Sequence, residues 1–184
     1  MGGRGTAEDG SAMDGEKNIL ILGLGNDCLG DDAVGLRVVQ GLRRKVRKGD
    51  YADVDLVEAG TGGMILLDLM AGYDGLILID AIQTGSGLPG RIHRLTEDQL
   101  PAGNSAAPWS AHHMGLRQIL ETGRRVGCEL PRTVIVYGVE TEISREWNRG
   151  CSPEVEQAVP EVVQRVIGEI SALRKTIRRG RGSP

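Results

Sequence analysis

The stretch NILILGLGNDCLGDD, residues 18–32, decides the fold class of this chain. It opens with an aliphatic run that ends in glycines, a pattern typical of a buried parallel strand followed by a tight turn. Apolar residues then recur at Val34, Val38, Leu42 and Val46, and cations gather near the end of this series. That spacing predicts an amphipathic helix over residues 32–48. A buried strand that turns directly into a helix indicates an α/β protein.

The rest of the chain repeats this alternation. Strand patterns lie at residues 54–58, 75–80, 91–95 and 133–138, and helix patterns at residues 64–70, 113–126 and 152–174. The run GLILID, residues 75–80, is apolar up to its last position, which favours a strand buried on both faces. We therefore expect an α/β three-layer sandwich: a single domain with a mainly parallel central sheet flanked by helices.

The ends of the chain differ from its middle. Residues 1–17 lack hydrophobic periodicity and are predicted to be a flexible tail, and residues 175–184 are predicted to be a basic flexible tail. Residues 18–174 form the expected domain, a length that suits one core. The first segment has no apolar region of the kind found in signal peptides. The longest apolar run, near residues 19–24, is far shorter than the roughly 20 residues of a membrane span. We expect a cytoplasmic protein with no membrane partner.

Composition excludes some functions. The formal net charge is -3 and aromatic residues make up 3% of the chain, so neither phosphate attraction nor base stacking is expected, and nucleic acid is not an expected partner. The cysteines Cys28, Cys128 and Cys151 are odd in number and form no C-x-x-C pair. This usage fits a reducing compartment. Nothing in the sequence requires a dimer, and a monomer is the expected state.

Polar residues follow the predicted strands, where the ligands of parallel sheets bind. Asp32 follows the first strand, Asp80 ends the third, and His112 and His113 precede a helix. Two carboxylates and one imidazole suit nickel, zinc or manganese, and three protein ligands leave coordination positions open. The same residues could instead cap helices and loops, as Asp31 or Asp32 would at a helix start. The residues alone leave both interpretations open.

A nucleotide site is a weaker interpretation. Gly23 and Gly25 supply G-x-G, but Cys28 stands where the dinucleotide-binding pattern requires a third glycine. Glu58 lies well beyond the roughly 20-residue spacing expected for the ribose-binding acid. A nucleotide-dependent oxidoreductase is therefore an alternative that the sequence does not favour.

The sequence does not identify a nucleophile. Cys28 has acidic neighbours that oppose a thiolate, and there is no G-x-S-x-G motif. The Asp31–Asp32 pair is not expected to share a proton, because adjacent residues at a helix start point in different directions.

Five segments, taken together and in order over residues 18–170, resemble the hydrogenase maturation endopeptidase family. The first is the strand, G-x-G-N turn and acidic pair of residues 19–35. The others are EAGTGGM at 58–64, LIDAI at 78–82, SAHHMGL at 110–116 and YGVE at 137–140.

The resemblance implies an endopeptidase that removes the C-terminal extension of the nickel-iron hydrogenase large-subunit precursor after nickel insertion. It assigns Asp32, Asp80 and His112 as metal-contacting and catalytic residues. The metal would be nickel supplied by the precursor, so no permanent cofactor is expected. Relatives can carry Glu at the first of these positions, so Asp32 has a shorter reach. The resemblance favours His112 as the ligand, although His113 could take its place.

The glycine-rich loop has an expected role of its own. Gly60, Thr61, Gly62 and Gly63 could let backbone amides approach the tail of the precursor closely, and are expected to bind substrate. Alternatively, these glycines only satisfy turn geometry. A metal-binding or precursor-binding chaperone without hydrolytic activity remains an alternative to the peptidase.

Overall fold

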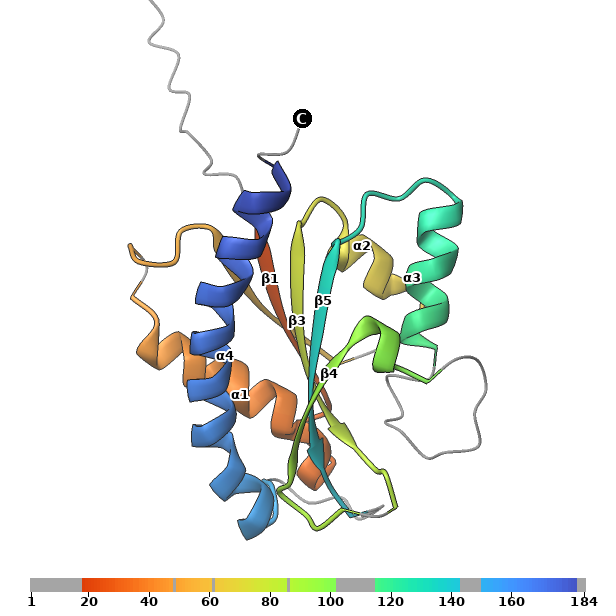
Figure 1. The fold of residues 1–184 in the computed structure, drawn as a ribbon. Helices are drawn as coiled ribbons and strands as arrows, with labels where there is room; N and C mark the ends of the chain where they lie inside the picture. Colours follow the sequence, from red (N-terminus) through yellow and green to blue (C-terminus); the bar gives the residue numbers. More distant parts are fainter. Residues whose placement is uncertain are drawn as a thin grey trace, which may run out of the picture.

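The computed structural model describes residues 18–47, 49–60, 62–85, 87–101, 115–142 and 150–181. Within them, five strands form one sheet in the order β2-β1-β3-β5-β4 (Figure 1). The strands are β1 (Ile19–Leu24), β2 (Val54–Ala59), β3 (Gly75–Ile82), β4 (Ile92–Thr96) and β5 (Thr133–Glu140). Four strands are parallel, and β4 pairs antiparallel with β5. The predicted sheet is confirmed.

Helices cover both faces of the sheet. They are η1 (Gly30–Ala33), α1 (Val34–Lys45), α2 (Ile65–Met70), η2 (Glu97–Gln99), α3 (Leu116–Arg125) and α4 (Pro153–Arg181). In Figure 1, α1 and α4 lie on one side of the strands, and α2 and α3 lie on the other. This is the three-layer α/β sandwich, in a single domain, that the sequence predicts.

Strand side chains alternate between two hydrophobic cores. Ile19, Ile21, Ile77 and Ile79 belong to the core beneath α1 and α4. The intervening leucines belong to the core beneath α2 and α3; they are Leu20, Leu22, Leu76 and Leu78. Every residue of β1 and β3 is buried. Since each buried leucine or isoleucine side chain contributes about 1.5–3 kcal/mol, these two strands supply much of the hydrophobic core.

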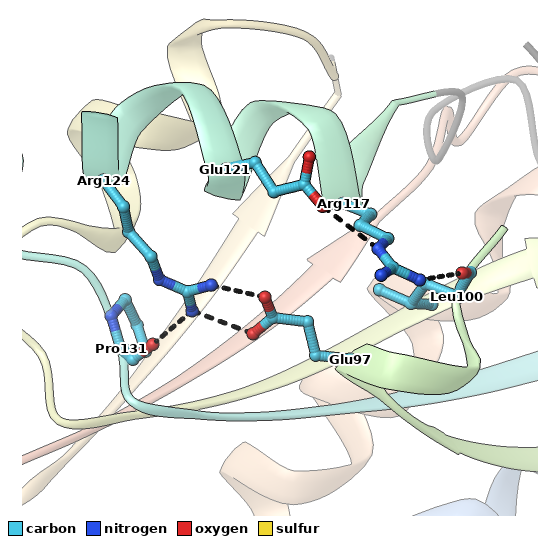
Figure 2. A network of polar contacts seen from close by, with 6 residues as sticks. All are labelled: Glu97, Leu100, Arg117, Glu121, Arg124 and Pro131. Atoms are coloured by element: carbon cyan, nitrogen blue, oxygen red, sulfur yellow. Dashed lines mark hydrogen bonds and ion pairs between the residues drawn. The ribbon is translucent and has the colours of Figure 1, made fainter. Parts of the chain in front are cut away.

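Polar contacts hold α3 beside the end of β4 (Figure 2). Arg124 binds both carboxylate oxygens of Glu97 in η2 and donates to the Pro131 carbonyl at 3.2 Å. Arg117 donates to the Leu100 carbonyl at 3.4 Å and to Glu121 at 3.2 Å. Bidentate guanidinium–carboxylate pairs fix orientation as well as distance. The network therefore sets the position of α3 relative to the antiparallel edge of the sheet.

Some element ends differ from the sequence predictions. A 3₁₀ turn precedes α1, and β3 and β5 each extend two residues further, pairing Ile82 with Glu140. Helix α4 continues to Arg181, so residues 175–181, expected in a flexible tail, are helical. Ile177 packs against the core, and cations near a helix C-terminus are favourable, which explains the extension. Residues 1–17 lie outside the described part of the chain.

The strand order creates a switch point at the centre of the sheet. Strands β2 and β3 pair with opposite edges of β1, so the connections around β1 leave in opposite directions. Ligands of open α/β sheets bind outside the carboxyl ends of the strands at such a point. The turn after β1 and the end of β3 are therefore the places to look for a site. None of the helices in the described ranges is long and apolar enough to span a membrane.

Candidate active site at the carboxyl end of the sheet

The turn after β1 carries Asp32 against the end of β3. Asp32 lies in η1, and η1 packs against β3. Three residues further on, Gly35 lies so close to β3 that a Cβ atom there would stand 2.5 Å from the Ile79 carbonyl oxygen. Only glycine permits this approach without displacing backbone. The structure thus brings the segment of Asp32 beside the part of β3 that carries Asp80.

The acidic residues of this turn have different surroundings. Asp27 forms an ion pair with Arg37 at 2.9 Å. Asp31 accepts hydrogen bonds from the Ser152 amide at 2.5 Å and the Ser152 hydroxyl at 3.1 Å, which joins the turn to the start of α4. The Oδ2 atom of Asp32 is buried. Asp31 therefore has a structural role at the start of α4.

Asp80 lies near the carboxyl end of β3, the central strand of the sheet, two residues before the strand ends at Ile82. Its side chain is fully buried, and its Oδ1 atom accepts a hydrogen bond from the Ala81 amide at 2.8 Å. It lies opposite Gly138 of the neighbouring strand β5. Burying a carboxylate costs free energy unless hydrogen bonds, an opposite charge or a metal compensate for the lost water. A buried carboxylate at a switch point is therefore a candidate functional group.

The glycine-rich loop lies beside the same turn. A Cβ atom on Gly60 would stand 3.7 Å from the Gly25 carbonyl oxygen, so the end of β2 lies close to the turn after β1. Met64 and Ile65, just beyond the loop, are 57% and 53% exposed. Gly62 and Gly63 are described, whereas Thr61 lies outside the described residues. The role of this loop in substrate binding stays a prediction.

The imidazole of the predicted metal site falls outside the described residues, because His112 and His113 belong to the undescribed range 102–114. Among the residues that the structure does describe, no group of three His, Cys, Asp or Glu side chains is placed to hold a metal ion. Asp32 and Asp80 supply carboxylate oxygens, which suit a divalent cation that also has nitrogen ligands. The three-residue metal site stays a prediction.

The structure reveals a second buried carboxylate, to which the sequence analysis assigned no role. Glu140, at the end of β5, is 3% exposed. It accepts hydrogen bonds from the Thr84 amide at 2.7 Å and the Thr84 hydroxyl at 3.0 Å. The Nε2 atom of His93 lies 3.2 Å from its Oε2 atom, close enough for an ion pair when His93 is protonated. The sequence signal that could have identified Glu140 is a charged residue at the end of an apolar strand.

The thiol of Cys151 also lies near this end of the sheet, as does that of Cys28 in the turn after β1. The Sγ atom of Cys151 is 3.7 Å from the Gly30 carbonyl oxygen, which accepts its hydrogen bond. Burial, and the negative charge of Asp31, raise the pKa of the Cys151 thiol to about 11. A thiol with this pKa stays protonated at neutral pH and is a poor nucleophile.

Fold and site together define a class of protein: an open α/β sheet with the Asp32 turn and the buried carboxylate of Asp80 at the switch point of its strands, an arrangement suited to an enzyme. The comparison with protein families is specific. The family model HycI, described as hydrogenase maturation protease, matches residues 36–169. This chain belongs to the hydrogenase maturation protease family, and it is a peptidase.

Individual relatives agree with the family model. The chain is 36% identical to the hydrogenase 2 maturation protease of Escherichia coli K12, over 83% of this chain and 90% of the relative. Among solved structures, it is similar to the hydrogenase maturating endopeptidase HybD from E. coli, with a TM-score of 0.71 over 86% of this chain and 93% of that one, at 36% identity. The [NiFe] hydrogenase maturation protease HybD from Thermococcus kodakarensis is 25% identical, with a TM-score of 0.63 over 82% and 97% of the two chains.

Proposed function

We propose that this peptidase removes the C-terminal extension of a nickel-iron hydrogenase large-subunit precursor after nickel has been inserted. The similar protein from T. kodakarensis is a [NiFe] hydrogenase maturation protease, which supports a hydrogenase of this class as the substrate. The observation that carries the proposal is the meeting of the Asp32 turn and the Asp80 strand end at the switch point of the sheet.

In this proposal, Asp32 and Asp80 contact the nickel that the precursor carries, together with His112 of the segment SAHHMGL. Nickel is then part of the substrate, and the peptidase needs no permanent metal. Carboxylate and imidazole ligands suit nickel, and a partial ligand set can bind a metal already held by another protein. The bound nickel would supply a positive charge near the peptide bond that is cut. A precursor without nickel would lack the metal that these three residues contact.

The test is intact mass spectrometry of a matched large-subunit precursor after incubation with the peptidase. Nickel-loaded and nickel-free precursors are treated side by side. Loss of a C-terminal peptide from the loaded form alone is the expected result. Equal cleavage of both forms would contradict nickel recognition, while leaving the substrate assignment intact. No cleavage of either form would contradict the assignment of a large-subunit precursor as substrate.

A further inference from the structure

The connection between β3 and β4, of which residues 83–85 and 87–91 are described (the 83–91 loop below), contributes one wall of a pocket at the carboxyl end of the sheet. The pocket has a volume of about 460 Å³ and is lined by Asp31, Leu88, Pro89, Glu142, Ser152 and Glu154. Leu88 is 80% exposed, an unusual state for a large apolar side chain beside a pocket. Asp31 and Asp32 belong to the same turn, η1, so the turn that carries Asp32 forms part of the pocket wall.

Glu140 forms hydrogen bonds with residues near both ends of this loop. The amide and the hydroxyl of Thr84 bind different oxygens of its carboxylate, at 2.7 and 3.0 Å. Its backbone carbonyl accepts a hydrogen bond from the Gly90 amide at 2.8 Å, and its own amide donates to the Arg91 carbonyl at 2.8 Å. Both ends of the loop are therefore tied to a single residue of β5.

Gly87, in the middle of the loop, packs against the Glu140 side chain. A Cβ atom on Gly87 would stand 2.7 Å from the Cδ and Oε2 atoms of Glu140, so the loop backbone packs directly on the carboxylate. A buried carboxylate is costly unless several donors satisfy it. A neutral apolar residue could fill the space, but it could not bind the loop at both Thr84 groups.

We infer that Glu140 is a positioning residue, which holds the 83–91 loop as a preformed wall that binds the extended C-terminal segment of the precursor through Leu88 and Pro89. This inference rests on the function proposed above. Preorganised loops bind peptides with a smaller loss of conformational entropy, so the loop raises affinity for the precursor. Glu140 acts through the loop and does not touch the peptide bond that is cut.

The experiment measures kcat and KM for cleavage of the nickel-loaded precursor, together with the melting temperature of each variant. Glu140→Ala frees the Thr84 end of the loop and removes the side chain on which Gly87 packs, while the backbone hydrogen bonds at Gly90 and Arg91 remain. We expect KM to rise about tenfold, while kcat changes less than about threefold. Leu88→Ala removes the apolar contact and also raises KM. Glu140→Gln keeps an acceptor for the Thr84 amide and a donor for the Thr84 hydroxyl oxygen, so its KM stays within about threefold of wild type.

Glu169→Ala is the matched control. Glu169 on α4 accepts hydrogen bonds from Arg94 at 2.6 and 2.9 Å and from Tyr137 at 2.9 Å, away from the loop. Its removal lowers the melting temperature and leaves KM unchanged. If Glu140→Ala lowers the melting temperature in the same way and leaves KM unchanged, Glu140 is only structural and the inference is wrong.

Gly87→Ala tests the inference without altering Glu140, in case Glu140→Ala does not fold. The added methyl group pushes the loop off the carboxylate and raises KM. An unchanged KM in this variant, or a Glu140→Gln variant as impaired as Glu140→Ala, overturns the positioning role. Failure of the wild-type protein to cleave the precursor would instead contradict the proposed function, so the two failures are distinguishable.

Discussion

The two ends of the central sheet treat their carboxylates differently. At the amino end, Arg174 binds the Asp53 carboxylate and lies 4.9 Å from the centre of the Tyr51 ring. At the carboxyl end, Asp31 is bound by the amide and hydroxyl of Ser152, and Glu140 is bound by those of Thr84. Arginine neutralises a carboxylate, whereas amides and hydroxyls orient it and leave its charge. The contrast applies to Asp53 against Asp31, since at the carboxyl end Asp27 does pair with Arg37 and Glu140 lies beside His93.

The first way to break this comparison is to neutralise one aspartate at each end. Asp80→Asn should lower the rate of precursor cleavage about 100-fold or more, because it removes a charge at the switch point. Asp53→Asn should leave that rate within about twofold of wild type. Initial rates from intact mass spectrometry measure both, with melting temperatures as a check on folding. Full activity of a folded Asp80→Asn protein would show that this carboxylate does not take part.

The second prediction concerns pH and the amino end. The hydrogen bond from Arg174 holds the pKa of Asp53 below its ordinary value. A lowered folded-state pKa gives stability that is complete above the unfolded-state pKa, near 4, and is lost as pH falls through the lower folded value. Asp53→Asn should therefore cost about 1 kcal/mol of unfolding free energy at pH 7.

Denaturant titrations of both proteins between pH 7 and pH 2.5 measure this difference. The two free energies of unfolding should converge as the pH falls below about 4. A constant difference over the whole range would mean that the ion pair is not its source.

The third prediction compares two glycines in similar backbone conformations. Gly63 has a φ of 82° and Gly72 a φ of 81°, and a Cβ atom on either would meet no atom within 4 Å. Alanine at either position should therefore cost about 1 kcal/mol of stability through backbone strain. Gly63 belongs to the glycine-rich loop, whereas Gly72 lies near the start of β3 at the amino end. If the loop binds substrate, only Gly63→Ala should raise KM, by about threefold.

The melting temperatures of the two alanine variants should fall together, and the KM values should separate. Equal KM values in both variants would mean that the glycines of this loop only satisfy turn geometry and do not bind substrate.

The fold was predictable because its signals are local. The isoleucines and leucines of β1 and β3 alternate along the chain, so a window of a few residues shows which positions are buried. Element ends were less predictable, because tertiary contacts set them. Ile177 extends α4 by packing against a core formed mostly by distant residues.

The site was predictable only in part. Asp80 could be identified as a polar residue that follows an apolar run, and its strand does lie at the centre of the sheet. Glu140 likewise follows an apolar run and is the last residue of its strand, but its partner Thr84 lies 56 positions away in the sequence. The bond between Asp31 and Ser152 spans 121 positions. Pairings at such separations depend on strand order, which no local pattern contains.

The smallest expected effect is that of removing the Cys151 thiol at the carboxyl end of the sheet. Burial and the charge of Asp31 raise the pKa of Cys151 to about 11, so at pH 7 the thiol is protonated. Cys151→Ala should therefore cleave the precursor within about twofold of the wild-type rate. In a Cys28→Ala, Cys128→Ala background, alkylation of Cys151 by iodoacetamide should be slow at pH 7 and should accelerate up to about pH 11. Rapid alkylation at pH 7, together with loss of cleavage in Cys151→Ala, would instead identify Cys151 as the nucleophile. In that case the carboxylates would position the precursor, and the thiolate would attack it.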